Sequence, residues 1–562
     1  MWKLVVNEFS DDDGKWKAAL KVAGAVAGVG LAGYGVYYIG TKVVKSQSTT
    51  NTPPMEPAVD TPEKKLEVAT RFKEEGNKLF MTSKYEEAKK LYTDAIEACP
   101  SDAPKVLAVF YQNRAATSDA MEQWESVIID CDEALLRDHR YQKAYSRRGK
   151  AKLALSRYDD AVLDTASGYY LQSSRQTKQN LQLFMQAVSE SARVACAKLM
   201  QSRTEPLNFG LEVINSYVAN SPSDPVMSKL EEYAKEAARP FHKACQKMLA
   251  AAPSSSILAD LDEELAQSDS PYYPEALLLR ATVYSIGGCP DRAEKDLDTL
   301  ISMDQLSDRF RSSVLLRRGL HHVTTDVAMG LADLDKAAEA DKTNPDVYHQ
   351  RAQIFMLMQR LHQAKEDFST AHDLHIKATG TYNIHVFIHK LACDLHSQQG
   401  DVMSLLEEME KLCKKHPEVA ELWLIYGQMQ IMLGRFIDAD ESYQTSLKHC
   451  PDNPKIYIQR AALMLTWKKD TKLAIDFLNK ARELDKDCDA VYESLGAVLL
   501  QNGQVKEAVE IFHLQTKTSR TVVECQQAFC MLESARAQLY VAEKFELQNL
   551  ANVFLSPMPP PV

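Results

Sequence analysis

The body of this chain repeats a pair of small residues, and this repeat constrains the fold more than any other feature. A small residue is followed twelve positions later by another small or aliphatic residue, and successive copies are 34 residues apart from Ala115 to Gly149 and from Gly427 to Ala461. The pairs are Gly76/Ala88, Ala115/Val127, Gly149/Ala161, Ala281/Ala293, Gly319/Leu331, Ala352/Ala364, Gly427/Ala439 and Gly496/Ala508. An aromatic residue often follows four positions after the second small one, at Tyr92, Phe368, Tyr443 and Phe512.

This spacing predicts pairs of antiparallel helices. Two helices approach closely only where a small side chain faces a small or branched one, and a single pair cannot bury its apolar face, so the copies must stack. The pattern resembles that of the tetratricopeptide (TPR) family. The resemblance implies an all-α fold, a TPR helical-hairpin solenoid that covers most of the chain.

The beginning of the chain predicts a membrane anchor. The stretch from Val22 to Thr41 has no charge, and as a helix it would be about 30 Å long, which is the thickness of a bilayer core. Lys21 and Lys42 flank it. A cleaved signal peptide is the alternative, but the acidic Glu8 and Asp11 precede the apolar stretch, and a signal peptide has a basic start. We therefore expect a single transmembrane helix that acts as a signal anchor.

The composition divides the rest of the chain into parts. Residues 46–62 are rich in Ser, Thr and Pro and cannot bury enough apolar surface to fold. The repeat register is lost between about residues 171 and 270, which still have helical periodicity. The predicted parts are a short N-terminal segment (1–21), the anchor (22–41), a flexible linker (42–66), an N-terminal domain of three repeats (67–170), a degenerate helical connector (171–270), a C-terminal TPR domain that binds clients (271–545) and a tail (546–562).

Five polar residues in the first three repeats predict an anion receptor. The first helix of each unit lines the concave face of such a solenoid, and the positions concerned hold Lys73, Asn77, Asn113, Lys143 and Arg147. Arginine forks a carboxylate, lysine adds a mobile charge and asparagine supplies orienting donors. A peptide that ends in aspartate carries two carboxylates at its terminus and is the expected ligand.

The sequences around these positions carry a more specific resemblance. The segments 72–78 (Phe-Lys-Glu-Glu-Gly-Asn-Lys), 111–115 (Tyr-Gln-Asn-Arg-Ala) and 143–149 (Lys-Ala-Tyr-Ser-Arg-Arg-Gly) resemble the dicarboxylate-clamp TPR family. The resemblance implies that the clamp holds the Glu-Glu-Val-Asp tails of the seventy- and ninety-kilodalton heat-shock chaperones.

The equivalent positions become mostly apolar downstream. They include Leu278, Leu316, His349, Leu424 and Ile425, which we expect to contact apolar segments of a client protein. The alternative is that this strip is ordinary core, either because the superhelix closes or because the last helices, from about residue 521 to 549, fold back onto it. The sequence leaves both open.

Composition and motifs exclude several other functions. With 66 basic and 77 acidic residues the net charge is -11, so we expect no nucleic-acid partner. The eleven scattered cysteines fit reduced thiols in a cytosol-facing domain. His385, His389 and Cys393 share a helix face, yet no compact ligand set accompanies them, and we expect no metal. The sequence has no catalytic motif and no motif for a phosphate or cofactor, so we expect no enzyme activity.

The order of anchor, tether, clamp and long repeat array resembles the TPR-type import receptors of the translocase of the outer mitochondrial membrane. This resemblance implies a single-pass protein of the mitochondrial outer membrane with its C-terminal domain in the cytosol. Its partners would be chaperone tails, mitochondrial precursor proteins and other translocase subunits. Two alternatives stay open, namely a clamp-TPR co-chaperone at another membrane, such as the ER or a plastid envelope, and a scaffold that tethers organelles.

Overall fold

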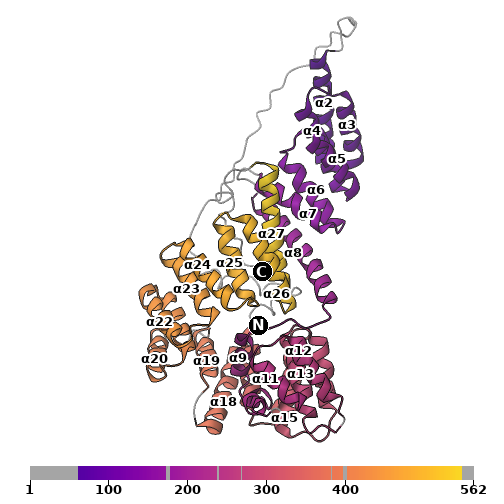
Figure 1. Ribbon diagram of the computed structural model, residues 1–562. Helices are drawn as coiled ribbons and strands as arrows, with labels where there is room; N and C mark the ends of the chain where they lie inside the picture. The colour runs from indigo at the N-terminus through magenta and orange to yellow at the C-terminus, as the bar shows by residue number, and fades with distance from the viewer. Residues whose placement is uncertain are drawn as a thin grey trace, which may run out of the picture. The chain divides into compact units, whose positions relative to one another are not determined.

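The computed structural model describes residues 61–546, apart from 172–176, 237–238, 268, 381–382 and 397–401. These residues form helices joined by short turns, and none of the described residues belongs to a strand (Figure 1). The predicted all-α solenoid of helical hairpins is confirmed. The predicted transmembrane helix at 22–41 lies outside the described residues. Among the helices that are described, none is both long enough and apolar enough to cross a membrane.

The described helices fall into two compact units that divide after Ala144. In the first unit, α2 packs against α3, α3 against α4, and α4 against α5. The bounds are α2 (Pro62–Met81), α3 (Tyr85–Ala98), α4 (Pro104–Ala120) and α5 (Trp124–Arg137), followed by α6 (Gln142–Ala154), within which the division falls.

The second unit contains the remaining helices. After α7 and α8 comes a stretch of short helices, and from α13 onward long helices pack in successive pairs, such as α15 with α16 and α25 with α26. The bounds are α7 (Tyr158–Tyr170), α8 (Thr177–Ser202), α9 (Leu211–Asn220), the 3-10 helix η2 (Met227–Lys229), α10 (Leu230–Ala234), α11 (Pro240–Leu249), α12 (Ser254–Leu265), α13 (Tyr273–Ile286), α14 (Pro290–Ile301), α15 (Asp308–His322), α16 (Val327–Ala340), α17 (Pro345–Leu357), α18 (Leu361–Thr379), α19 (Ile384–His396), α20 (Val402–Lys415), α21 (Ala420–Met432), α22 (Phe436–His449), α23 (Pro454–Trp467), α24 (Thr471–Leu484), α25 (Asp489–Gln501), α26 (Val505–Thr518) and α27 (Val522–Lys544).

Helix α2 begins earlier than the sequence indicated. It starts at Pro62, inside the predicted linker of residues 42–66. Thr61 is its N-cap, with a side chain that accepts from the Lys64 N–H, and a proline at the first helical position loses no hydrogen bond. The local capping signal at 61–62 therefore extends the first hairpin by five residues, more than one helical turn, beyond the start at residue 67 that the repeat pattern indicated. The predicted domain boundaries as a whole stay a prediction.

The small residues of the repeat face the rings that follow them by sixteen positions. A Cβ atom added to Gly496 would lie 2.4 Å from Cε1 of Phe512, and one added to Gly427 would lie 2.5 Å from Cε1 of Tyr443. Both rings are fully buried. The repeat pattern thus records a physical requirement, because each ring fills the space that a side chain on the facing helix would need.

A second repeated contact joins charged residues on the same helix pairs. An arginine on the first helix forms an ion pair with an aspartate fifteen or sixteen residues later on the second helix. We call this arginine the tie arginine. The ties are Arg114–Asp130 at 2.6 Å, Arg280–Asp296 at 2.7 Å, Arg318–Asp333 at 2.8 Å and Arg351–Asp367 at 2.7 Å, with Arg148–Asp164 at 2.5 Å following the same spacing. The aspartates of these pairs are nearly inaccessible to solvent, so each depends on its arginine.

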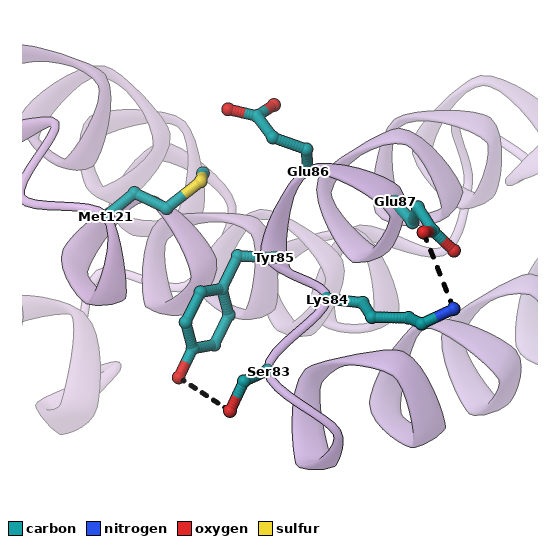
Figure 2. Close-up of a pocket in the computed structure, with 6 residues that line it drawn as sticks. All are labelled: Ser83, Lys84, Tyr85, Glu86, Glu87 and Met121. Atoms are coloured by element: carbon teal, nitrogen blue, oxygen red, sulfur yellow. Dashed lines mark hydrogen bonds and ion pairs between the residues drawn. The ribbon is translucent and has the colours of Figure 1, made fainter.

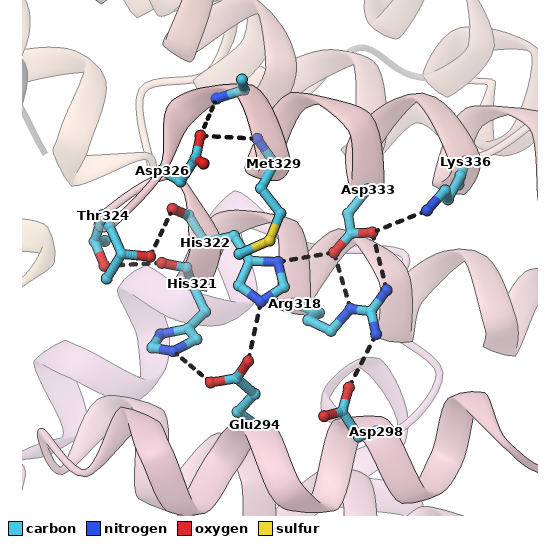
Figure 3. Close-up of polar contacts among 12 residues, drawn as sticks. Glu294, Asp298, Arg318, His321, His322, Thr324, Asp326, Met329, Asp333 and Lys336 are labelled. Carbon is cyan, nitrogen blue, oxygen red and sulfur yellow. Dashed lines mark hydrogen bonds and ion pairs between the residues drawn. The ribbon is translucent and has the colours of Figure 1, made fainter.

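The tie also reaches the preceding repeat. Figure 3 shows Arg318 of α15 between Asp333 of α16 and Asp298 of α14, at 2.8 and 2.9 Å. His322 lies beside it, with one ring nitrogen 2.9 Å from Asp333 and the other 3.0 Å from Glu294 of α14. The same side chains therefore join the two helices of one repeat and connect that repeat to the one before it.

We expect the substitution Gly496→Ala to destabilise the protein. Alanine in a helix interior is normally more favourable than glycine by about 1 kcal/mol. Here the new methyl group would lie against the Phe512 ring, and overpacking of a buried contact costs about 1–3 kcal/mol. Urea unfolding followed by circular dichroism measures the difference. The matched control is Gly496→Ala combined with Phe512→Leu, which should lose less stability than the sum of the two single changes. A stabilised Gly496→Ala protein would contradict the packing account.

Candidate functional site

Helix α2 carries the first two predicted clamp residues. Lys73 and Asn77 are one turn apart, so they lie on the same face of the helix. The Lys73 side chain is 24% exposed, and its Nζ is 3.8 Å from Oε1 of the exposed Glu74, which is a weak ion pair. The ammonium group therefore keeps most of its attraction for an incoming anion.

A buried tyrosine fixes the orientation of Asn77. The Tyr92 hydroxyl donates a hydrogen bond of 2.8 Å to Oδ1 of Asn77. Burial raises the pKa of Tyr92 to about 12, so the hydroxyl keeps its proton at neutral pH and remains a donor. Because the Asn77 carbonyl is engaged in this way, its NH₂ group is the part that is left to donate to a ligand. The same ring lies against Gly76, so a single residue serves both packing and orientation.

Asn113 is held by the backbone of α4 and by its neighbour. The main-chain carbonyl oxygen of Asn113 accepts a hydrogen bond of 3.0 Å from Oγ1 of Thr117. The next residue, Arg114, is the tie arginine, and its guanidinium lies 5.4 Å from the centroid of the Tyr111 ring while it bonds to Asp130. Arg114 is fixed by these contacts and therefore sets the rotation of α4 that determines where Asn113 lies.

Lys143 and Arg147 are one turn apart on α6. Lys143 is exposed, and Arg147 is half-buried. Arg147 is again followed by a tie arginine, Arg148, which bonds to Asp164 of α7. The division into two units falls between Ala144 and Tyr145, so the first unit contains four of the five predicted residues and the second contains Arg147. Joint binding by all five stays a prediction.

The tie arginines are functional residues that the sequence interpretation missed. In both Asn113-Arg114 and Arg147-Arg148 the predicted ligand-binding residue directly precedes a tie arginine. The signal was present as an Arg/Asp spacing of sixteen, which falls between the first and second helices of a repeat. A search for small residues alone does not detect it.

A shallow surface hollow in the first unit lies away from the predicted clamp. It lies at the turn between α2 and α3, and its volume is about 290 Å³ (Figure 2). Its side chains bond mainly to each other, with the Tyr85 hydroxyl 3.5 Å from Ser83 and the Lys84 ammonium 3.6 Å from Glu87. Its lining contains none of the predicted clamp residues, and consists of Ser83, Lys84, Tyr85, Glu86, Glu87 and Met121.

The predicted client strip is mostly buried. The exposed fraction is 0% for Leu278, 3% for Leu316, 1% for His349 and 7% for Leu424, while Ile425 is half-buried. The last helix, α27, packs against α7, α8 and α26. Leu278 instead shares a core cluster with apolar residues of the connector, among them Phe209, Ile214, Val226 and Met227. Client contact at these residues stays a prediction, and at the buried ones it requires that the covering residues move.

The histidines singled out as metal candidates have other partners. His389 Nδ1 is 2.8 Å from His349 Nε2, and His385 is 3.2 Å from Glu421. Burial lowers the pKa of His389 to about 4, which keeps its ring neutral. Within the described part of the chain, no group of three or more His, Cys, Asp or Glu side chains could hold a metal ion.

We expect Tyr92→Phe to weaken binding of a peptide that ends in aspartate. The ring stays, so packing against Gly76 is kept, but the hydrogen bond that orients Asn77 is lost. A net hydrogen bond contributes about 0.5–1.5 kcal/mol. Isothermal titration calorimetry measures the affinity. Tyr85→Phe, which removes a long and exposed hydrogen bond on the same helix, is the control and should bind like the unsubstituted chain. Equal affinity of both variants would show that Tyr92 does not orient the site.

Comparison with known proteins gives the following matches, and no protein-family model matches the chain. The mitochondrial import receptor subunit TOM70 of Rattus norvegicus is 29% identical over 497 residues, which are 86% of this chain and 81% of the relative. The Hsp70/Hsp90 co-chaperone cns1 of Schizosaccharomyces pombe is 32% identical over 166 residues, 28% of this chain and 46% of the relative. The crystal structure of the yeast Tom70 matches with a TM-score of 0.47 at 20% identity, covering 86% of this chain and 99% of that one.

The sequence matches to import receptor subunits confirm the resemblance to TPR-type import receptors. The relatives are an import receptor subunit and a co-chaperone, and neither is named as an enzyme. The rat, mouse and human receptor subunits each match over 86% of this chain. The chain is therefore a homologue of the mitochondrial import receptor subunit TOM70 along most of its length.

Proposed function

We propose that this protein is an import receptor of the mitochondrial outer membrane that accepts precursor proteins from cytosolic chaperones. The observation that carries the proposal is the homology to TOM70, an import receptor subunit, over 86% of this chain and 81% of the relative. A match of that extent takes in at least part of both the clamp repeats and the long C-terminal array. It favours a mitochondrial receptor over a co-chaperone at the ER or a plastid envelope.

The first step of the proposed mechanism is the docking of a chaperone tail. Lys73, Asn77, Asn113, Lys143 and Arg147 bind the C-terminal Glu-Glu-Val-Asp segment of a seventy- or ninety-kilodalton heat-shock chaperone. The two carboxylates at the end of that segment require cations and oriented donors, which are the residue types present. The homology to an Hsp70/Hsp90 co-chaperone over 166 residues supports this ligand class.

The arrangement of charge in the first unit supports the same ligand. The Arg114 guanidinium is engaged by Asp130 and cannot serve a second carboxylate without breaking a buried ion pair. Lys143 is exposed, and Lys73 forms a weak ion pair with Glu74. The structure thus separates the arginine that holds the repeat together from the lysines that can meet a ligand.

The later steps use the rest of the chain. The C-terminal repeats receive the precursor at the strip of Leu278, Leu316, His349, Leu424 and Ile425, of which Ile425 is the most accessible. The segment 22–41 anchors the protein as a single transmembrane helix with the repeats in the cytosol. Other translocase subunits then take over the precursor.

Arg147→Ala should weaken binding of a Glu-Glu-Val-Asp peptide by about 2–3 kcal/mol, because a charge-assisted hydrogen bond to a carboxylate is lost. That loss corresponds to roughly 30- to 150-fold in the dissociation constant measured by calorimetry. Lys90→Ala removes one exposed charge from α3, the second helix of the first repeat, and serves as the control.

Two further results make the clamp test specific. The same peptide with an amidated C-terminus should bind the unsubstituted chain much more weakly, since one carboxylate is gone. Lys90→Ala should leave the affinity unchanged. An Arg147→Ala protein that is folded and binds the peptide as tightly as the unsubstituted chain would refute the clamp.

A further inference from the structure

The inner face of the C-terminal repeats already holds a piece of the chain itself. Residues 220–224 run from the last residue of α9 into the loop before η2, in the connector. They meet residues of α15 and α17 that directly precede tie arginines, namely Arg317 before Arg318 and Gln350 before Arg351. In the first repeats these are the positions of Asn113 and Arg147, the predicted peptide-binding residues.

Three contacts hold this short stretch. The Arg317 guanidinium donates to the carboxylate of Asp224, and also to the Leu278 carbonyl at 2.8 Å. Gln350 Nε2 donates to the Asn220 carbonyl at 2.9 Å. The N–H of Ser223 donates to Oδ2 of Asp346 at 2.8 Å. The segment is therefore bound through two of its main-chain groups, the Asn220 carbonyl and the Ser223 N–H, and through the carboxylate of Asp224.

This chemistry is that of a bound peptide. A TPR groove is expected to recognise an extended ligand through amides that bond to its main chain and cations that bond to its acidic groups. In contrast, two core helices meet mainly through apolar side chains. Directly after the segment, Val226, Met227 and Leu230 bury their side chains in the same cluster as Leu277 and Leu278, so apolar contacts adjoin the polar ones.

The fit is incomplete. Nε of Arg317 and Oε1 of Gln350 are buried and make no hydrogen bond in the described structure, although both side chains are almost inaccessible. Burial also raises the pKa of Asp346 to about 7, against the opposing hydrogen bond from Ser223. Unsatisfied buried groups and a desolvated carboxylate weaken the attachment of the covering segment. A segment of another chain that formed hydrogen bonds with Arg317 Nε and Gln350 Oε1 would therefore compete effectively with residues 220–224.

We propose that residues 220–224 are an intramolecular ligand of a peptide-binding site on α13, α15 and α17, and that an extended segment of another polypeptide with an acidic side chain replaces them. The acidic side chain takes the place of Asp224 at Arg317. The inference deepens the proposed function, on which it rests for the identity of the competing chain, because it states what must leave before a precursor can reach Leu278.

The first test is hydrogen exchange of the full chain followed by mass spectrometry. A detachable segment opens without its surroundings, so amides of 221–230 should exchange at least about tenfold faster than those of α13, α15 and α17. Exchange of all these amides at one common rate would mean that the segment is ordinary core, and would overturn the proposal. This comparison needs no substitution and is therefore independent of any folding defect.

The second test is a substitution that removes the charge of Asp224 but keeps the hydrogen bonds of the turn that follows it. Oδ1 of Asp224 accepts from the N–H groups of Val226 and Met227 at 3.0 and 2.8 Å. In Asp224→Asn the amide oxygen can still accept both, while the ion pair with Arg317 is lost. Exchange of residues 221–230 should rise by about a further tenfold, with α14 and α16 unchanged. Asp304→Asn, at an exposed position, is the matched control. Equal acceleration throughout α13–α17 would contradict the proposal.

The third test uses a labelled peptide with the sequence of residues 206–230. It shows whether the site on α13, α15 and α17 binds this peptide when the peptide is a separate molecule. The tethered segment competes at a high effective concentration, so the unsubstituted chain should bind the peptide about tenfold more weakly than the Asp224→Asn chain. The same peptide with Asn at position 224 should bind neither. Failure of the Asp224→Asn chain to bind the copy would overturn the proposal. No chaperone tail or precursor is used, so this outcome is distinct from failure of the receptor function.

Discussion

The structure depends on one repeated contact. A glycine or another small residue on the first helix of a repeat packs against an aromatic ring sixteen positions later, on the second helix. At Gly76, Gly427 and Gly496 the facing ring occupies the space that a Cβ atom would need. This contact brings the two helices of a repeat close together, which exposes an apolar edge that only the next repeat can cover. Stacking, and therefore the long inner faces on which ligands are expected, follows from that one packing requirement.

The tie arginines add direction to this packing. Apolar contacts alone leave helices free to rotate by small amounts, but a bidentate ion pair with a buried aspartate fixes the rotation of the first helix. The residue immediately before each tie arginine is then presented at a reproducible place. Asn113, Arg147, Arg317 and Gln350 all occupy that place. The first repeats and the C-terminal repeats differ in what contacts these residues. In the first repeats the proposed partner is the tail of another protein, and in the C-terminal repeats it is the connector of the same chain.

Much of this could be predicted from the sequence because it is local. The helix pairs and the ring positions such as Tyr443 lie within one repeat length, where periodicity is informative. The candidate clamp residues recur at about the repeat length, and their joint binding stays a prediction. The tie arginines were equally local, and were missed because only small residues were compared. The burial of Leu278 and His349 was not predictable in the same way. Leu278 is covered by residues in a part of the chain without repeat register, and no spacing rule relates Asp224 to Arg317. The orientation of Asn77 by Tyr92 likewise needed coordinates.

An import receptor on the outer face of mitochondria carries its repeats in the cytosol, so the location of this homologue of TOM70 is the measurement that decides whether the proposed function is right. The full chain with a fluorescent protein at its C-terminus is expressed, and isolated organelles are treated with protease. We expect fluorescence at the mitochondrial rim that is lost when protease is added outside, because the proposed orientation places the repeats in the cytosol. Fluorescence on the ER, or a fluorescent domain that the protease cannot reach, would contradict it.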